Sequence, residues 1–329
     1  MLSDGERRTM RRLEATLLAD AEFTRSLRPL AREFERLAAP VVVGLDDEPA
    51  AAAALTWAAG EAAALRCPLR VVHAFRSPLV VDPLGVVPTV ADIGGPQAAA
   101  TELVDAALTR ARSIAPDVDI CASTVRDSPR RLLLRESRTA RLLVVGSRRL
   151  DARPTTAARL LRRPLTWRLA AAASCPVAVV HPSPTPPTDP RARVVVGVDR
   201  LTCADAVGYA FRTAAQRGLP VTAVHAWIPG LPSASRAPRP ATSEAAAASL
   251  VEDAVCRWRQ LYPHVPLRIE VVRRDPVTAL VAASVGAALV VVGSRERRPG
   301  RAAPSVSRAV VDRAAGPVAV VRARSQARG

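Results

Sequence analysis

Val41-Val42-Val43-Gly44-Leu45-Asp46 and Val194-Val195-Val196-Gly197-Val198-Asp199 are two versions of one stretch of sequence, and this duplication decides the fold. Later segments repeat in the same order. Leu142-Leu143-Val144-Val145-Gly146-Ser147 returns as Leu289-Val290-Val291-Val292-Gly293-Ser294, and Cys175-Pro176-Val177 returns as Gly316-Pro317-Val318. Paired landmarks lie roughly 150 residues apart, which is the size of a domain rather than of a short repeat. The chain is therefore a tandem duplication.

Each copy alternates β-branched apolar runs with Ala-rich segments of helical length. Runs such as Val41 to Val43 are apolar without alternation, which is typical of strands covered on both faces in a parallel sheet. The pattern predicts an α/β fold: two tandem five-stranded doubly wound parallel sheets, each with four helices. The expected strands lie near 40–46, 68–75, 118–125, 141–147 and 176–181 in the first copy, and near 193–199, 219–227, 266–273, 288–294 and 317–322 in the second.

The domain organisation follows from the limits of the duplication. Residues 1–38 have no counterpart in the second copy, and the Ser3 to Glu6 spacing predicts a capped helix start, so we expect a short helical extension there. The first copy spans 39–181 and the second 193–323, separated by a Pro-rich linker at 182–192 and followed by a tail at 324–329. Pro-rich linkers favour extended geometry, so this one is expected to be a semi-rigid spacer.

The composition of the chain limits the kinds of partner and the cellular compartment that we expect for it. The chain has 329 residues and a net charge of +17, which raises the possibility of nucleic acid, but all 47 basic residues are Arg. The absence of Lys and Asn beside abundant Ala, Arg and Pro indicates a GC-rich coding bias, so we consider nucleic acid an unfavoured partner. Five single cysteines without a C-x-x-C pair suggest buried, reduced thiols of a cytoplasmic protein. No signal-like or membrane-spanning run is apparent, and a soluble protein without membrane association is expected.

A first strand ending in Gly-x-Asp, a His-Ala after the second strand, a Val-Val-Gly-Ser-Arg turn after the fourth and a Cys-Pro-Val fifth strand together resemble the universal stress protein family. The resemblance covers nearly 85% of the chain. It implies an adenine nucleotide alpha hydrolase-like sheet of order 3-2-1-4-5, with ligands at the switch point between the first and fourth strands. It also implies that the two copies pair as an intramolecular pseudo-dimer. Separately, residues 1–38 resemble the start of a high-GC bacterial family of unknown function.

Some members of the family bind ATP through a G-x2-G-x9-G-[S/T] motif, and this chain departs from it. In the first copy Arg149 stands at the second glycine position and Arg163-Pro164 replaces the final Gly-Ser. In the second copy Glu296 and Pro304 stand at the second and third glycine positions. Side chains there block close approach to phosphates, and a carboxylate repels them. These changes argue against ATP binding in the family's manner, and no other cofactor or metal is expected.

The residues that match the family's nucleotide site are candidates for a vestigial or weak ATP site. Asp46 and Asp199 match the carboxylate that contacts the nucleoside, although each has an alternative role as a helix cap. Gly146 and Gly293 have an alternative role in a tight turn after the strand. Ser305 and Ser307 make the second copy the less altered site. The full candidate set is Asp46, Gly146, Ser147, Asp199, Gly293, Ser294, Ser305 and Ser307.

The other polar and aromatic residues give weaker indications of a binding or catalytic site. Arg-rich loops surround both motif regions (Arg148 to Arg163 and Arg295 to Arg301), and their guanidinium groups are alternative anion ligands. His73 and His225 are expected to pack structurally, His181 and His264 stand alone in the sequence, and the four tryptophans are expected in the core. No constellation for catalysis or metal binding occurs in the sequence.

Three functions remain open at this point. The sequence favours a non-enzymatic stress-response or signalling module; an unknown protein partner and a homodimer of the whole chain are the partners that we consider for it. The first alternative is an ATP-binding stress sensor that uses the second copy. The second alternative is Arg-mediated binding of nucleic acid or another anion.

Overall fold

A computed structural model describes residues 39–46, 49–75, 94–147, 165–182, 192–199, 204–227, 244–294 and 306–322. The expected N-terminal helices, most of the Pro-rich linker and both Arg-rich loops lie outside these ranges. None of the described helices combines the length and apolar composition that crossing a bilayer requires.

Each copy contains five described strands and four described helices, as the sequence predicted. The first copy has β1 (Val41–Leu45), α2 (Pro49–Leu65), β2 (Leu69–Phe75), α3 (Gly94–Ile114), β3 (Ile120–Arg126), α4 (Pro129–Glu136), β4 (Leu142–Gly146), α6 (Leu165–Ala170) and β5 (Val177–Val180). The second copy has β6 (Arg193–Gly197), α7 (Ala204–Arg217), β7 (Val221–Ala226), α8 (Glu244–Leu261), β8 (Leu267–Val272), α9 (Pro276–Ala283), β9 (Ala287–Ser294), α10 (Val306–Arg313) and β10 (Val318–Arg322).

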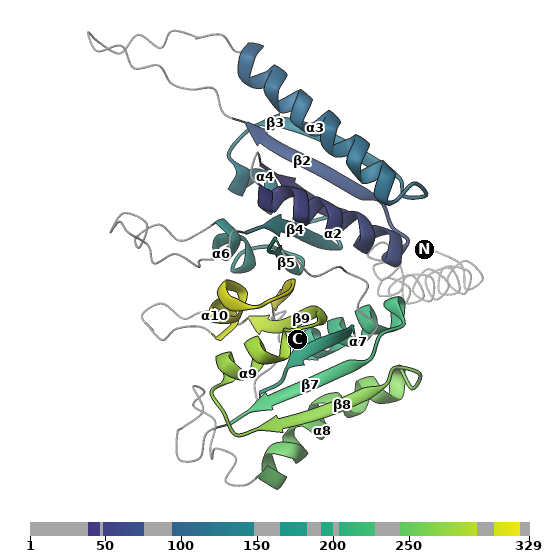
Figure 1. The fold of residues 1–329 in the computed structure, drawn as a ribbon, viewed down its shortest axis with the longest axis vertical. Coiled ribbons are helices and arrows are strands. Elements are labelled where there is room, and N and C mark those ends of the chain that lie inside the picture. The colour runs from purple at the N-terminus through teal and green to yellow at the C-terminus, as the bar shows by residue number, and fades with distance from the viewer. Residues whose placement is uncertain are drawn as a thin grey trace, which may run out of the picture. The chain divides into compact units, whose positions relative to one another are not determined.

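The strands of both copies join in one ten-stranded sheet of order β3-β2-β1-β4-β5-β10-β9-β6-β7-β8 (Figure 1). Within each copy all pairings are parallel and the order is 3-2-1-4-5, as the resemblance implied. The two copies meet where β5 and β10 pair antiparallel, with Ala178 opposite Ala319. Because Val177 pairs with Val320 and Val179 with Val318, the ladder is symmetric about that Ala pair. The duplicated copies therefore form an intramolecular pseudo-dimer.

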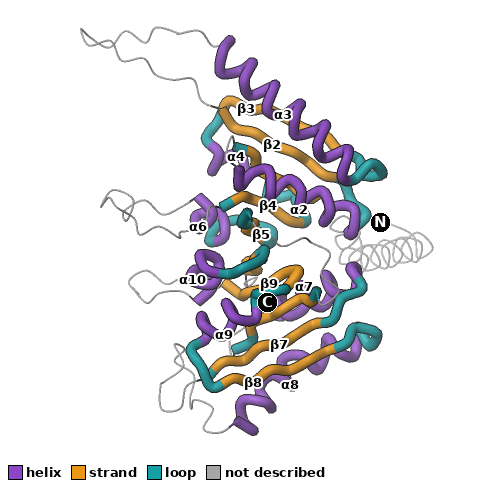
Figure 2. Tube along the Cα trace, viewed as in Figure 1, coloured by secondary structure: helices purple, strands orange, loops and turns teal. Residues whose placement is uncertain are grey.

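Helices lie on both sides of the strands in each half of the sheet (Figure 2). One buried cluster gathers side chains from α2, α3, α7 and α8, and the other gathers side chains from α4, α6, α9 and α10. Both clusters include residues of β5 and β10, so the hydrophobic core continues from one copy into the other on each face. Burial of apolar surface, at about 25 cal/mol per Å², therefore stabilises the pairing of the copies together with each copy's own fold.

Helix ends repeat between the copies. Ser128 caps α4 and Asp275 caps α9, and a proline follows each cap at the first helical position. At the other end, α2 and α7 close with the same pair of backbone hydrogen bonds, which leaves Arg66 and its counterpart Gly218 with positive φ angles of 48° and 65°. Arg66 thus holds a conformation that favours glycine.

Two sequence expectations were wrong in part. Cys67 is buried, but Cys121 and Cys256 are exposed, because Cys121 lies on the edge strand β3 and Cys256 on the outer side of α8; all described cysteines are free. The tryptophans are half-buried rather than fully in the core. An Arg guanidinium lies 5.4 to 5.9 Å from the ring centroid of each, close enough for cation–π attraction. The amphipathic indole suits such a boundary position.

Candidate functional site

The carboxyl ends of β1 and β4 bring the first-copy candidates together. The two strands are neighbours in register from Val41 opposite Leu142 to Gly44 opposite Val145. Asp46 follows the end of β1 and is exposed, while Gly146 ends β4 and Ser147 follows it. This is the topological switch point of the first copy, the position where open α/β sheets bind ligands.

Gly146 is required by packing at this point. A Cβ atom built on Gly146 would lie 2.5 Å from the carbonyl oxygen of Ala50 and 3.0 Å from the amide nitrogen of Ala51. Both atoms belong to the backbone of the first turn of α2, so neither is able to move aside as a flexible side chain does. The close approach of β4 to α2 therefore explains this glycine without any ligand.

The backbone of Ser147 is engaged on both sides. Its N–H donates to the carbonyl of Val180 at 2.9 Å, which extends the β4–β5 ladder by one residue. Its carbonyl oxygen lies 2.9 Å from Nδ1 of His181. An amide that already donates within the sheet is not free to donate to a phosphate.

Histidine side chains fix the strand ends beside the candidate carboxylates. In the first copy Nδ1 of His73 lies 3.0 Å from the carbonyl oxygen of Leu45, the residue before Asp46. In the second copy Nδ1 of His225 lies 2.8 Å from the carbonyl oxygen of Val198, the residue before Asp199. Both histidines lie within the second strand of their copy, where their structural role agrees with the expected packing.

The second copy builds the same switch point with differences. β6 and β9 are parallel neighbours with a register irregularity between Arg193 and Val194, and the exposed Asp199 lies beyond the end of β6. Gly293 and Ser294 are the last residues of β9, where Ser294 is paired with Arg322 of β10. The second-copy ladder thus extends one residue further than its first-copy counterpart, which ends with Gly146 opposite Val180.

Of the two remaining candidates, the structure describes Ser307 but not Ser305. Ser307 is buried in the first turn of α10 and does not face solvent. Ser305, Glu296, Pro304, Arg149, Pro164 and the Arg-rich loops lie outside the described residues.

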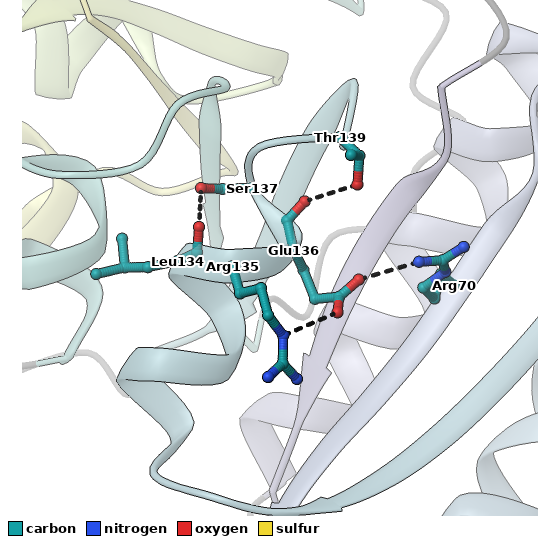
Figure 3. Close-up of polar contacts among 6 residues, drawn as sticks. All are labelled: Arg70, Leu134, Arg135, Glu136, Ser137 and Thr139. Atoms are coloured by element: carbon teal, nitrogen blue, oxygen red, sulfur yellow. Dashed lines mark hydrogen bonds and ion pairs between the residues drawn. The ribbon is translucent and has the colours of Figure 1, made fainter.

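A polar cluster at the end of α4 was not found by sequence reasoning (Figure 3). The carboxylate of Glu136 accepts a hydrogen bond of 3.1 Å from Arg70 on β2, and Arg135 lies 4.0 Å away. The hydrogen bond to Glu136 raises the pKa of Arg70. Because Arg70 is partly exposed, this contact fastens α4 to the sheet but indicates no binding site.

Serine residues at the ends of α4 and α9 form a matching pair that the sequence comparison also missed. Ser137 donates to the Leu134 carbonyl at 2.8 Å and accepts from the Ser174 amide at 3.1 Å. Ser284 makes the equivalent bonds, donating to the Val281 carbonyl at 2.6 Å and accepting from the Ala315 amide at 2.9 Å. Both hydroxyls are buried, and each ties a helix end to the turn before the fifth strand of its copy.

The described residues show no grouping of three His, Cys, Asp or Glu side chains with which to hold a metal ion. The site is thus defined by two exposed carboxylates at the two switch points, each beside a glycine and a serine at the end of the neighbouring strand.

Comparisons with known proteins show which family has this architecture. The Universal stress protein family model matches residues 39–181 and 190–322. Universal stress protein Rv2005c of Mycobacterium tuberculosis is 32% identical over 295 residues, covering 86% of this chain and 96% of that protein. Universal stress protein Rv2623 of the same organism is 34% identical over 296 residues, with coverage of 86% and 96%. The crystal structure of a universal stress protein from Archaeoglobus fulgidus has the same fold, with a TM-score of 0.61 at 15% identity, covering 87% of this chain and 98% of that one.

The fold and the duplicated switch points define a tandem doubly wound α/β protein. The chain belongs to the universal stress protein family and carries two copies of its domain. The matches to the family model begin at residue 39, so they do not test the resemblance of residues 1–38 to another family.

Proposed function

We propose that this protein is a non-enzymatic stress-response or signalling module of the cytoplasm, in which both ancestral nucleotide sites have lost their phosphate cradles. The observation that carries the proposal is the commitment of the Ser147 amide to Val180. In an anion site at the start of a loop, free backbone amides supply the hydrogen bonds to phosphate. Here the first amide after Gly146 already serves the sheet.

The retained glycine does not argue for a ligand. Close packing of β4 against Ala50 and Ala51 requires glycine at position 146 whether or not a nucleotide binds.

The sequence of the adjoining loops supports the same conclusion. Arg149 and Pro164 in the first copy, and Glu296 and Pro304 in the second, stand where the family's ATP-binding members have small residues. Proline lacks an amide donor, and the Glu296 carboxylate repels a polyphosphate. The second copy retains more hydroxyl groups, but this carboxylate stands in its motif.

Equilibrium dialysis of the full chain with labelled ATP tests the proposal. We expect no saturable binding in the micromolar range. Saturable micromolar binding of one or two equivalents would overturn it and favour the ATP-sensor alternative. The matched variants Asp46→Ala and Asp199→Ala then locate the site, because a ligand held by the second copy is lost only in the latter.

A further inference from the structure

His181 lies where the two copies meet and bonds to both. It follows β5 and is only 3% exposed. Its Nδ1 lies 2.9 Å from the carbonyl oxygen of Ser147, at the candidate site of the first copy. Its Nε2 lies 2.7 Å from the carbonyl oxygen of Val311, on α10 of the second copy. One imidazole ring thus spans the boundary between the copies.

The two partners decide how many protons the ring holds. A backbone carbonyl oxygen accepts hydrogen bonds and has no proton to donate. Both ring nitrogens of His181 must therefore donate, and a neutral imidazole carries a proton on only one of them. Both bonds form together only when the ring is the imidazolium cation. His73 and His225 differ, because a single ring nitrogen of each lies at a carbonyl oxygen, a contact that needs only one ring N–H.

The surroundings provide a counter-charge. Asp312 is the residue after Val311; burial raises the pKa of its carboxyl group, whereas the neighbouring Arg308, Trp167 and His181 lower it. The carboxylate and the Arg308 guanidinium form an ion pair of 3.8 Å. Arg308 in turn lies 5.9 Å from the ring centroid of Trp167 on α6, so this cluster also joins the two copies.

Other charged groups on the packed elements are cationic. They are Arg313 on α10, Arg168 on α6, and Arg322 at the end of β10. Asp312 carries the single carboxylate among the described residues of α6, α10 and β10. The arginines disfavour a positive charge on His181, whereas the Asp312 carboxylate favours it.

The duplication places a cation at the same point in the second copy. Aligning Val177–Val180 of β5 with Val318–Val321 of β10 sets His181 opposite Arg322 in the repeat. Arg stays charged at every physiological pH, whereas His loses its charge near neutrality. The first copy therefore carries the titratable version of a position that is permanently charged in the second.

We propose that His181 is a proton-dependent latch between the two copies. When protonated, it ties the Ser147 strand end of the first copy to α10 of the second. When it loses a proton, the ring keeps only one N–H for the two carbonyl oxygens, and the contact between the copies weakens.

NMR of the imidazole nitrogens in the full chain tests the protonation state directly. At pH 7 we expect both ring nitrogens of His181 to carry protons, while His225, which is also buried, carries one and serves as an internal control. A neutral His181 ring with a single protonated nitrogen at pH 6 and pH 7 would overturn the proposal.

Discussion

Glu61 and Arg217 form a buried ion pair between the copies, and its removal tests how far the two copies depend on each other. Glu61 on α2 is fully buried and pairs with Arg217 at the end of α7, whose side chain is 16% exposed. Neither carboxylate oxygen of Glu61 has another hydrogen-bond partner among the described residues. Arg217 also lies 5.4 Å from the ring centroid of Trp57. Each charge thus depends on the other.

The magnitude follows from this burial. Desolvation lowers the pKa of Arg217 to about 10, so the guanidinium stays protonated at neutral pH and needs its partner. Glu61→Gln leaves that cation buried without a counter-charge, and breaking such a pair costs about 3–5 kcal/mol. Replacing both residues in Glu61→Leu/Arg217→Leu removes both charges, and we expect this variant to recover most of the loss. Chemical denaturation of the full chain measures the three free energies of unfolding.

An exposed pair provides the control. Glu252 and Arg259 lie 3.9 Å apart with side chains 54% and 66% exposed, so Glu252→Gln should change stability by less than about 1 kcal/mol. If Glu61→Gln costs no more than this control, or if the double variant is no better than Glu61→Gln, the assignment of a mutually dependent buried pair is wrong.

Three further predictions concern single positions. Arg66→Gly should raise the free energy of unfolding by about 0.5–1 kcal/mol and the thermal midpoint with it, because glycine adopts a positive φ without strain, as Gly218 does at the equivalent position of the second copy; a lower midpoint would refute this. Gly146→Ala should cost about 1–3 kcal/mol in denaturant unfolding, whereas Gly60→Ala, with open space around its Cβ, should be neutral or stabilising; equal effects would count against the packing argument. Desolvation raises the pKa of the half-buried Cys175 to about 12, so at pH 8 its labelling by a thiol reagent should lag far behind that of the exposed cysteines, and equal rates would contradict the raised pKa.

Much of the fold followed from the sequence because the duplication shows each strand twice. The runs at Val41 and Val194 are apolar on both faces, and only a parallel sheet covered by helices buries them. The antiparallel pairing of β5 with β10 was not predicted, since Val177–Val180 reads the same whether it lies at a free edge or against a second copy.

The site was predictable in its residues but not in its surroundings. Asp46, Gly146 and Ser147 meet at one switch point because the strand order places β1 beside β4. The packing reason for Gly146 depends on the distance between β4 and α2, which sequence spacing does not contain. Glu61 lies in an Ala-rich helix and would be placed on the surface by its charge; only the pairing of the copies brings Arg217 to it. His181 appeared isolated for the same reason, since Val311 lies 130 residues away.

A crystal of the full chain soaked in ATP most directly tests the central claim that both switch points have lost their phosphate cradles. Unoccupied switch points beside Asp46 and Asp199 are the result expected here. A nucleotide bound against either carboxylate, with its phosphates at the Gly146 or Gly293 strand end, would contradict it.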